Sequence, residues 1–402
     1  MKEKKILFLC GLFPKEKIKE VEQFSKGVIQ YAADALQWSF VNGMIANHLN
    51  IDVLTLPFIG SYPKRFKKLT IKPYNFFIKG INSGICPGFN NFTGYKLFSR
   101  YLSAKKEILN WAKSTEGEKI ILIYAIHTPF IKAAVEAKKI NSKIKICLIV
   151  PDLPEFMSHS SSLIRNTLKN LEGKLLENLL PQIDSFVVLT SFMVEKLKIQ
   201  QKPWVCIEGI YNISSELNFE EETKRENKTI LYTGTLSSQY GILNLLNSFK
   251  EIEDPNYQLW ICGEGNTRKI IEAQAERDKR IIYFGQISQE DVLKLQRRAT
   301  VLINPRTSDG EFTKYSFPSK TMEYLASGRP VIIHKLPGIP EEYFEYCFWE
   351  EKETISGLKE KIVSICSMEE EKLAEFGKRA RAFILENKNP KVQVEKMVKS
   401  LF

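Results

Sequence analysis

The sequence predicts an α/β protein of two domains, each built around a parallel β-sheet. Strand, turn and helix patterns alternate along the chain, as they do when crossover helices join parallel strands. The length of 402 residues, 44% of them hydrophobic, exceeds what one hydrophobic core usually supports. A polar, acidic stretch without periodicity, ISSELNFEEETKRENK, separates two series of repeats. We therefore predict domains at 1–212 and 213–385, followed by a helical segment at 386–402.

The first half of the chain has the element order of a Rossmann-like domain. Residues 4–14, KKILFLCGLFP, form a predicted strand that ends in a glycine turn, and 51–58, IDVLTLPF, form the next strand. Further strands are predicted within IILIYAIHTPF (120–130), KIKICLIVPDLPEFM (143–157) and IDSFVVLT (183–190). His127 and Asp152 follow two of these strands. A lone histidine more often has a structural role, and Asp152 can cap its own loop, so a functional role stays open for both.

Residues 60–106 interrupt this pattern with a segment dense in aromatic and basic side chains, including YPKRFKKLTIKPYNFFIKG. Aromatic rings enter the headgroup region of a bilayer and cations meet anionic lipids, so one interpretation is a peripheral contact with an anionic membrane. The other interpretation, equally supported, is a loop region that packs on its own core and presents a solvated basic face.

The net charge of +11 comes entirely from the first half. Residues 1–200 contain 29 Lys and Arg against 16 Asp and Glu, whereas the rest of the chain is slightly acidic. A basic surface suits nucleic acid, an anionic membrane or a lipid pyrophosphate. No helix-turn-helix, RNA-binding or zinc-finger pattern is present, so we expect no nucleic acid partner.

The seven cysteines have neither CxxC nor Cys/His metal spacing, and several lie in apolar strand-like runs. They are interpreted as buried thiols of a protein in a reducing compartment, with no metal site. The N-terminal MKEKKILFLCGLFP lacks a small-residue cleavage site and is interpreted as the first strand. No stretch of 18 or more apolar residues occurs, which excludes a transmembrane helix. We expect a cytoplasmic protein, with the inner face of the cell membrane as its candidate contact.

The stretch from Val301 to Ile333 carries the clearest signal of a ligand site. VLIN and PVII are typical of buried strands, and FPSKTMEYLAS between them has helical spacing with Gly328 as the stop. A helix N-terminus favours a phosphate, and Lys320 in the first turn adds a full charge. Glu323, one turn later, can accept hydrogen bonds from a ribose diol. The pattern predicts a nucleotide-sugar site, whereas the plainer alternative is a solvated Glu323 beside a Lys320 that caps its own helix.

The segment FPSKTMEYLASGRPVI resembles the donor-site helix of family-four retaining glycosyltransferases, such as those of bacterial polysaccharide biosynthesis. These enzymes have the GT-B fold, in which two Rossmann-like domains with parallel sheets face a central cleft and the last helix crosses back to the first domain. The resemblance implies that Glu323, as the second Glu of an E-x7-E motif, binds the ribose. The first Glu of that motif falls at Tyr315, and nearby Glu311 is a candidate replacement.

The resemblance also implies which residues bind the donor. Usual members carry an Arg and a Lys that clamp the diphosphate, but the corresponding residues here, Thr235 and Tyr240, are uncharged. We favour Lys320 over Lys314 and Arg306 as the cation that stabilises the leaving diphosphate. The other expected donor contacts are Gly234, Gly263, Arg306, Tyr315 and the segment formed by Ser316, Phe317, Pro318 and Ser319.

What the resemblance implies is a hexosyltransferase-type enzyme (EC 2.4 class) that moves a sugar from a nucleotide diphosphate sugar, with UDP as the favoured nucleotide, to a glycan or lipid-linked acceptor. Transfer would retain the anomeric configuration and need no metal or other cofactor. His127 and Asp152 are the expected catalytic residues of the first domain, beside Lys320 in the second. The pathway would be capsule, exopolysaccharide or other glycoconjugate biosynthesis. The alternatives are a GT-B sugar-nucleotide epimerase and a non-catalytic basic module that binds membrane or nucleic acid.

Overall fold

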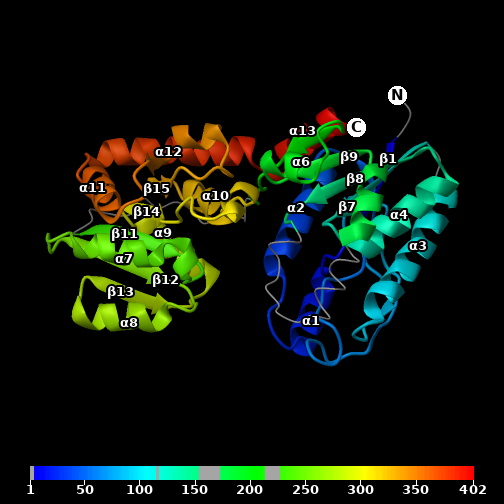
Figure 1. Ribbon diagram of the computed structural model, residues 1–402, viewed down its shortest axis with the longest axis horizontal. Helices are drawn as coiled ribbons and strands as arrows, with labels where there is room; N and C mark the ends of the chain where they lie inside the picture. The colour runs from blue at the N-terminus through cyan, green and yellow to red at the C-terminus, as the bar shows by residue number, and fades with distance from the viewer. Residues whose placement is uncertain (1–3, 115–116, 154–172, 213–226) are drawn as a thin grey trace. The chain divides into compact units, whose positions relative to one another are not determined.

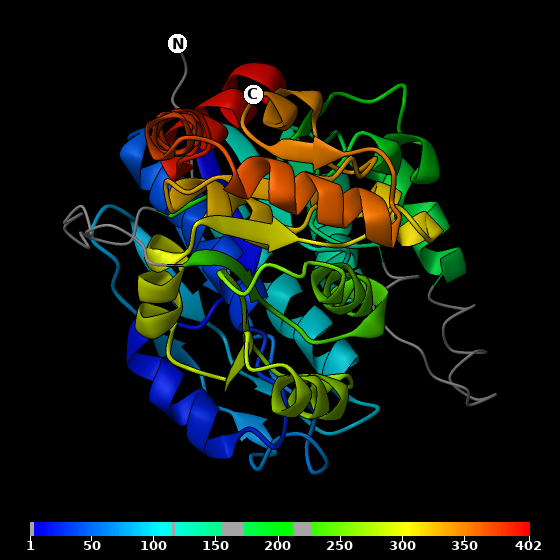
Figure 2. The same cartoon turned by 90° about the vertical axis from the view of Figure 1, so that its left-hand side faces the viewer.

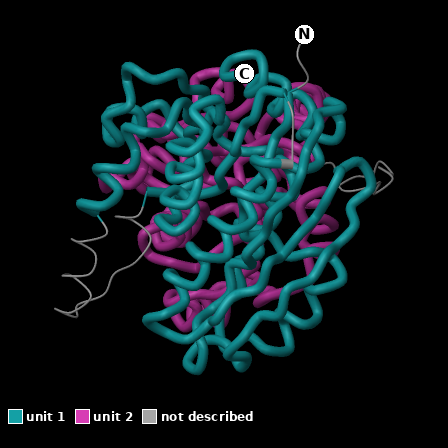
Figure 3. Tube along the Cα trace, turned by 90° about the vertical axis from the view of Figure 1, so that its right-hand side faces the viewer, with its two compact units in different colours: residues 1–210, 390–402 teal, residues 211–389 magenta. Residues whose placement is uncertain are grey.

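The computed structural model describes residues 4–114, 117–153, 173–212 and 227–402. The chain divides into two compact units, residues 1–210 with 390–402 and residues 211–389 (Figure 3). The boundaries predicted at 212/213 and 385/386 differ from these by a few residues. Helix α12 (Glu370–Asn387) continues past the second predicted boundary, so the change of unit comes only at Pro390. The acidic segment predicted to join the domains falls largely on 213–226, outside the described residues.

The first unit is built around a largely parallel sheet, as predicted. Among the described residues its strand order is β10 (Trp204–Cys206), β9 (Ser185–Val188), β8 (Ile144–Val150), β7 (Glu118–Tyr124), β1 (Lys4–Cys10), β2 (Asn50–Thr55), β5 (Ser83–Cys86) and β4 (Tyr74–Asn75). Leu9 of β1 pairs with Leu54 of β2 and Ile123 of β7, and all three side chains are buried. Buried apolar runs of this kind are typical of central parallel strands. The edge strand β4 departs from the prediction, because it pairs antiparallel with β5.

The helices of this unit include α1 (Ile18–Phe24), α2 (Tyr31–Ala46), α3 (Lys96–Ser114), α4 (Thr128–Ile140), α6 (Phe192–Lys196) and α13 (Pro390–Leu401). Helix α3 packs on α4, and the C-terminal α13 packs on α2. Gly43 permits the second contact, since a Cβ atom there would collide with the carbonyl of Pro390. Segment 60–106 is more ordered than a loop region: besides β4 and β5 it contains a short ladder of β3 (Thr70–Ile71) with β6 (Phe89–Asn90) and the start of α3.

The second unit has a sheet whose described strands all run parallel, in the order β13 (Ile281–Gly285), β12 (Tyr257–Cys262), β11 (Lys228–Thr233), β14 (Val301–Asn304), β15 (Val331–His334) and β16 (Phe348–Glu350). Its helices are α7 (Ile242–Lys250), α8 (Arg268–Arg277), α9 (Gln289–Arg298), α10 (Ser319–Ala326), α11 (Ile355–Cys366) and α12. Helices lie on both faces of the sheet; α7 packs with α11, and α10 with α12 (Figures 1 and 2).

The strand order of the second unit creates a topological switch point. From β11 the chain builds outward through β12 to β13, then returns to the other side of β11 and builds β14, β15 and β16. The connections that leave β11 and β14 therefore diverge. In open α/β sheets, ligands bind in the crevice at the carboxyl ends of the two strands where this divergence occurs.

All seven cysteines are free thiols, and all except the half-buried Cys206 are buried. Burial raises the pKa of Cys10 and Cys147 to about 12, which keeps both thiols protonated. They behave as small apolar core residues. Among the described helices, none has the length together with the apolar character needed to cross a bilayer.

Candidate functional site

The loops that follow β11 and β14 meet at the switch point of the second unit. The first continues through the short helix η4 (Ser238–Tyr240) to Gly241, which has a φ of +76°. A Cβ atom at Gly241 would collide with the carbonyl oxygen of Pro305, the first residue after β14. Only glycine combines this left-handed conformation with so close an approach, so the two loops are in direct backbone contact.

Helix α10 is fixed to the ends of the same two strands. The fully buried hydroxyl of Tyr324 accepts a hydrogen bond from the backbone N–H of Thr233 at 2.7 Å and donates one to its carbonyl at 2.9 Å. On the β14 side, the amide of Asn304 contacts the hydroxyl of Thr321 at 3.5 Å. The predicted helix and its stop are confirmed, since α10 ends at Ala326 and Gly328 has a φ of +79°. The role of Tyr324 was missed, because helical spacing alone marks it only as another inward position.

Lys320 and Glu323 lie together on one face of α10. The Nζ atom of Lys320 is 2.8 and 2.9 Å from the two carboxylate oxygens of Glu323. The buried Gln296 of α9 donates from Nε2 to the same carboxylate at 2.6 Å. The side chain of Glu323 is 22% exposed. It is therefore held between a cation and an amide rather than solvated, and sequence reasoning had not included Gln296.

Arg306 is a buried cation at the switch point. Its side chain follows β14, is 9% exposed and packs between two rings, with its guanidinium carbon 5.2 Å from the centre of Tyr240 and 4.6 Å from that of Phe312. Its Nη2 atom donates to the hydroxyl of Ser316 at 3.1 Å, whereas the buried Nε atom has no partner. Burial lowers the pKa of Arg306 from its usual value. Within the described residues no carboxylate pairs with it.

The loop before α10 holds most of the other predicted donor contacts. The short helix η5 (Glu311–Tyr315) lets the Tyr315 hydroxyl donate to the Glu311 carboxylate at 3.2 Å, so a carboxylate lies beside the position of the missing first Glu. Phe317 and Pro318 are buried, and Pro318 has no N–H to offer. Of the segment 316–319, only Ser319 is exposed.

Gly234 and Gly263 follow β11 and β12, and both make close contacts with the protein's own backbone. The N–H of Gly234 donates to the carbonyl of Cys262 at 3.0 Å. Gly263 has a φ of +137°, and a Cβ atom there would collide with the carbonyl of Gly234. These glycines bring two loops together, and the donor contacts expected of them stay a prediction. Thr235 is exposed, and its carbonyl accepts a hydrogen bond from Tyr232 at 2.8 Å.

His127 and Asp152 belong to the first unit, where they follow the neighbouring strands β7 and β8. The ring of His127 lies edge-on to Phe130 at a centroid distance of 4.4 Å, and its Nε2 atom is buried without a partner. Burial, with the nearby positive charge of Arg100 and Lys96, holds the pKa of His127 well below its usual value, so the imidazole is neutral at pH 7. Asp152 is exposed. Glu155, the other acid of this loop, lies outside the described residues.

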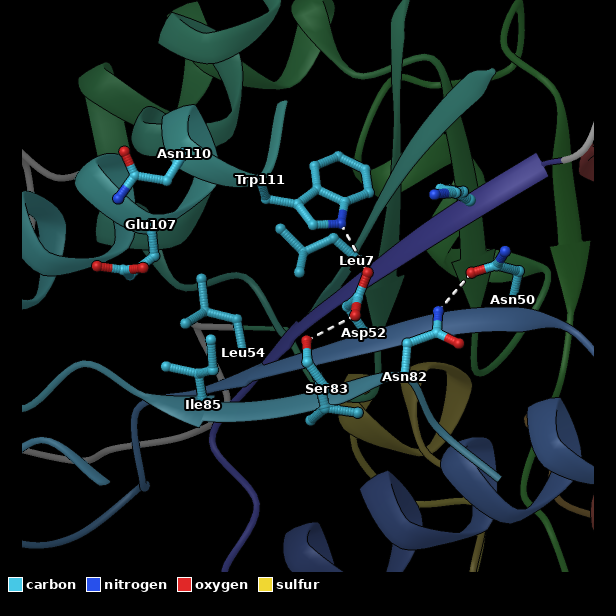
Figure 4. Close-up of a pocket in the computed structure, with 12 residues that line it drawn as sticks. Leu7, Asn50, Asp52, Leu54, Asn82, Ser83, Ile85, Glu107, Asn110 and Trp111 are labelled. Atoms are coloured by element: carbon cyan, nitrogen blue, oxygen red, sulfur yellow. Dashed lines mark hydrogen bonds between the residues drawn. The ribbon is translucent and has the colours of Figure 1, made fainter. Parts of the chain in front are cut away.

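Figure 4 shows a hollow of about 490 Å³ in the first unit, lined by residues of β1, β2 and β5 and by α3. Its carboxylate, Asp52, accepts hydrogen bonds from the indole N–H of Trp111 at 2.9 Å and from the hydroxyl of Ser83 at 2.6 Å. Both oxygens of Asp52 are thus occupied by the protein.

A second hollow, of about 590 Å³, lies beside α2 and the segment that follows β1. Asp34 lines it together with Trp38, Asn42 and Lys15. Asp34 accepts a hydrogen bond from the N–H of Phe13 at 2.6 Å, and burial raises its pKa to about 6. Sequence analysis had not singled out Asp34, since one acidic residue in a helix carries no distinctive signal.

The described residues contain no group of three or more His, Cys, Asp or Glu side chains placed to hold a metal ion. The switch point of the second unit brings together cations, a positioned carboxylate and a helix N-terminus. Such an arrangement can hold an anion beside a group with hydroxyls.

Comparisons with known proteins agree with this arrangement. Residues 214–383 match the family model described as "Glycosyl transferases group 1". Comparison with curated protein sequences finds no match to the chain.

Solved structures resemble the chain over nearly its whole length. The apo form of the lipopolysaccharide outer core galactosyltransferase WaaB superposes with a TM-score of 0.61 at 14% identity, over 99% of each chain. HepE of Anabaena in complex with UDP gives 0.60 at 14% identity, covering 99% of this chain and 100% of its own. Sucrose-phosphate synthase of Thermosynechococcus elongatus gives 0.60 at 16% identity over 99% of each chain. The fold is thus the predicted GT-B fold.

Proposed function

We propose that this chain, which carries a glycosyl transferases group 1 domain in residues 214–383 and has the GT-B fold, transfers a sugar from a nucleotide diphosphate sugar to a glycan or lipid-linked acceptor. The observation that carries the proposal is the switch point between β11 and β14. There α10 brings a helix N-terminus, Lys320 and Glu323 together at the carboxyl ends of two parallel strands. This is where an open α/β sheet binds a phosphorylated ligand.

The donor would bind with its ribose at Glu323 and its diphosphate near the start of α10. Glu323 is held by Gln296, so its position is set before a ligand arrives. Because Lys320 contacts both oxygens of Glu323, a bound diphosphate would share this lysine with the carboxylate. UDP is the proposed nucleotide, in line with the HepE structures, which were solved with UDP and with UDP and glucose.

The proposed reaction breaks the bond between the anomeric carbon and the diphosphate oxygen, and forms a bond from the acceptor hydroxyl oxygen to that carbon on the same face. The electron pair leaves with the diphosphate, which takes up the acceptor proton. Lys320 would stabilise the negative charge that develops on the leaving group. His127 is proposed to hydrogen-bond the sugar, which suits a neutral imidazole with an unpartnered Nε2. Asp152 is proposed to contact the acceptor hydroxyl. No metal is needed in this scheme.

The first unit is the proposed acceptor domain. The hollow beside Asp34 suits a sugar, because a carboxylate and the ring of Trp38 line it together and sugars combine hydroxyls with apolar ring faces. The pathway we propose is the synthesis of a bacterial capsule, exopolysaccharide or other glycoconjugate.

A peripheral contact with an anionic membrane at the cytoplasmic face completes the proposal. Tyr95, just before α3, and Phe98 and Leu102 on it are 46, 53 and 45% exposed, while Lys96 and Arg100 of the helix are buried. Tyr95 precedes the helix directly and its ring is 5.7 Å from that of Phe98. Surface helices of soluble proteins usually expose charged side chains and bury apolar ones. The start of α3 does the reverse, because it exposes aromatic rings and buries cations. Such an apolar face within a unit of strongly positive charge suits an anionic bilayer surface.

Transfer of radiolabelled sugar tests the function. Wild-type protein is incubated with labelled UDP-, GDP-, ADP- and TDP-sugars and a bacterial lipid and polysaccharide extract, and the label in the macromolecular and lipid fractions is counted. We expect one donor class to transfer its sugar and release the nucleoside diphosphate, and Glu323→Gln to slow this. Release of an altered free sugar without an acceptor product would instead identify an epimerase.

A further inference from the structure

We infer that Arg306 is the residue that binds the diphosphate of the donor, with the ring of Tyr240 as its platform. The inference rests on the proposed function and deepens it, because it assigns the main phosphate contact to a side chain on the β14 loop. That assignment also revises the preference for Lys320 that the sequence favoured.

Arg306 is a buried cation without an anion among the described residues. Its guanidinium is always protonated at physiological pH, yet the residue is only 9% exposed and no described carboxylate pairs with it. Its surroundings are the rings of Tyr240 and Phe312 and the hydroxyl of Ser316. Burying an unpaired charge is costly unless another interaction compensates it. A bound anion would provide that compensation.

Arg306 also has unused hydrogen-bonding capacity. The Nε–H is buried and has no partner, while Nη2 is held by Ser316. Nearly all buried polar groups in proteins have a partner, so an exception points to a missing ligand or water. A guanidinium held on one side by a hydroxyl and stacked between two rings is preorganised. It can offer its remaining N–H groups to two oxygens of a phosphate at once.

Arg306 lies at the switch point of the sheet, where a phosphorylated ligand is expected. Arg306 is the second residue after β14, and Tyr240 lies on the loop after β11, so the stacked pair spans the switch point. The loop after β11 supplies no cation of its own, since residues 234–241 are GTLSSQYG. The backbone contact of Gly241 with Pro305 fixes the two loops against each other. Arg306 thus supplies a positive charge at this position. Without it, the loop after β11 would offer a phosphate only backbone groups.

Lys320 is less suited to be the main phosphate contact. It is 39% exposed, and its ammonium group is already paired with both oxygens of Glu323. A diphosphate would have to compete with that carboxylate. We therefore assign the main diphosphate contact to Arg306, while Lys320 holds Glu323 towards the ribose and adds positive charge beside the leaving group.

The test compares the binding of a nucleoside diphosphate with that of its nucleoside. Isothermal titration is carried out with UDP and uridine, and with the GDP and ADP pairs in parallel, on wild-type protein, Arg306→Gln, Arg306→Lys and the control Arg379→Gln. Arg379 is exposed on α12, so its change removes the same charge away from the site. We expect Arg306→Gln to weaken diphosphate binding about 10- to 100-fold and nucleoside binding less than about twofold. Arg306→Lys should fall between, because it keeps the charge and loses the fork of donors.

A rescue variant separates charge from architecture. In Arg306→Gln combined with Tyr240→Lys, the positive charge is moved to the facing loop, and we expect at least a threefold recovery of diphosphate affinity over Arg306→Gln. If diphosphate and nucleoside affinities fall by the same factor, or if diphosphate affinity does not change, Arg306 only supports the loops and the inference is overturned. If the wild-type protein binds no nucleoside diphosphate at all, the proposed function fails together with the role of Arg306. Failure of the Arg306 assignment alone is recognised because the wild-type protein still binds the diphosphate.

Discussion

The substitution Glu323→Gln separates a ligand-binding role for this residue from a structural one. The change keeps the shape of the side chain and an oxygen that can still accept from Gln296, whose Nε2 lies 2.6 Å away. It removes the ion pair with Lys320, but that pair is partly exposed, at 39% and 22%, and contributes at most about 1 kcal/mol. We therefore expect the free energy of unfolding to fall by no more than about 1 kcal/mol.

The effect on donor binding should be larger. A carboxylate that accepts hydrogen bonds from ribose hydroxyls contributes about 1 to 3 kcal/mol, so the affinity for UDP should fall about 5- to 150-fold. Isothermal titration gives the affinity and urea denaturation the stability, with Glu375→Gln, an exposed position on α12, as the matched control. A loss of more than about 2 kcal/mol in stability with unchanged affinity would refute the assignment, because Glu323 would then serve only to hold α9 against α10.

Three further predictions concern other parts of the molecule. Tyr324→Phe leaves the buried backbone at the end of β11 without its partner; we expect a loss of about 1 to 3 kcal/mol in urea denaturation, and almost none for the control Tyr346→Phe. Burial, with the positive charge of the neighbouring arginines, lowers the pKa of Lys96 from 10.5 to about 7. Between these two pKa values the unfolded chain binds more protons than the folded protein. The free energy of unfolding should therefore rise from pH 7.5 to 9, by up to about 1.4 kcal/mol per pH unit. The variant Lys96→Met should flatten this rise. In the double variant Phe98→Ser and Leu102→Ser, we expect at least about tenfold less protein to sediment with phosphatidylglycerol vesicles. The weak binding to phosphatidylcholine vesicles should not change. If the wild-type protein binds equally to both vesicle types, an electrostatic membrane contact is contradicted.

The parts of the fold that the sequence predicted well are those where hydrophobic periodicity and turn residues agree. The segment from Val301 to Ile333 is such a case, since two short apolar strands flank a helix whose start and stop residues are both explicit. The antiparallel edge strand β4 was not predictable in the same way. Two residues, Tyr74 and Asn75, carry no period, and their pairing depends on where β5 lies in three dimensions.

The site shows a different limit. Sequence spacing correctly put Lys320 and Glu323 on one helical face, because residues three apart on a helix are neighbours. It could not show that Arg306 stacks on Tyr240, since these two residues are far apart in sequence and meet only through the order of β11 and β14 in the sheet. The same holds for Gln296, whose contact with Glu323 joins α9 to α10.

For residues 60–106, composition alone indicates a surface rich in aromatic and basic residues. It does not show which of these side chains are exposed. The abundance of aromatic and basic residues was evident in the sequence, but which side chains are exposed depends on how α3 is rotated. The helix buries Lys96 and Arg100, where they bind the carbonyls of the loop after β2, and leaves Phe98 exposed. Average hydrophobic patterning would have predicted the opposite rotation.

The central claim, that the second unit binds a nucleotide diphosphate sugar, is tested most directly by thermal denaturation of the wild-type protein with UDP-, GDP-, ADP- and TDP-sugars, each beside its free nucleoside. A ligand that binds only the folded protein raises the melting temperature by mass action, by about 2.7 kcal/mol of stability at 100 times its Kd. We predict that one class of nucleotide sugar raises the melting temperature clearly, while its nucleoside does so far less. If no nucleotide sugar shifts the transition even at millimolar concentration, the switch point of this protein does not bind a donor, and the assignment of a glycosyltransferase activity is contradicted.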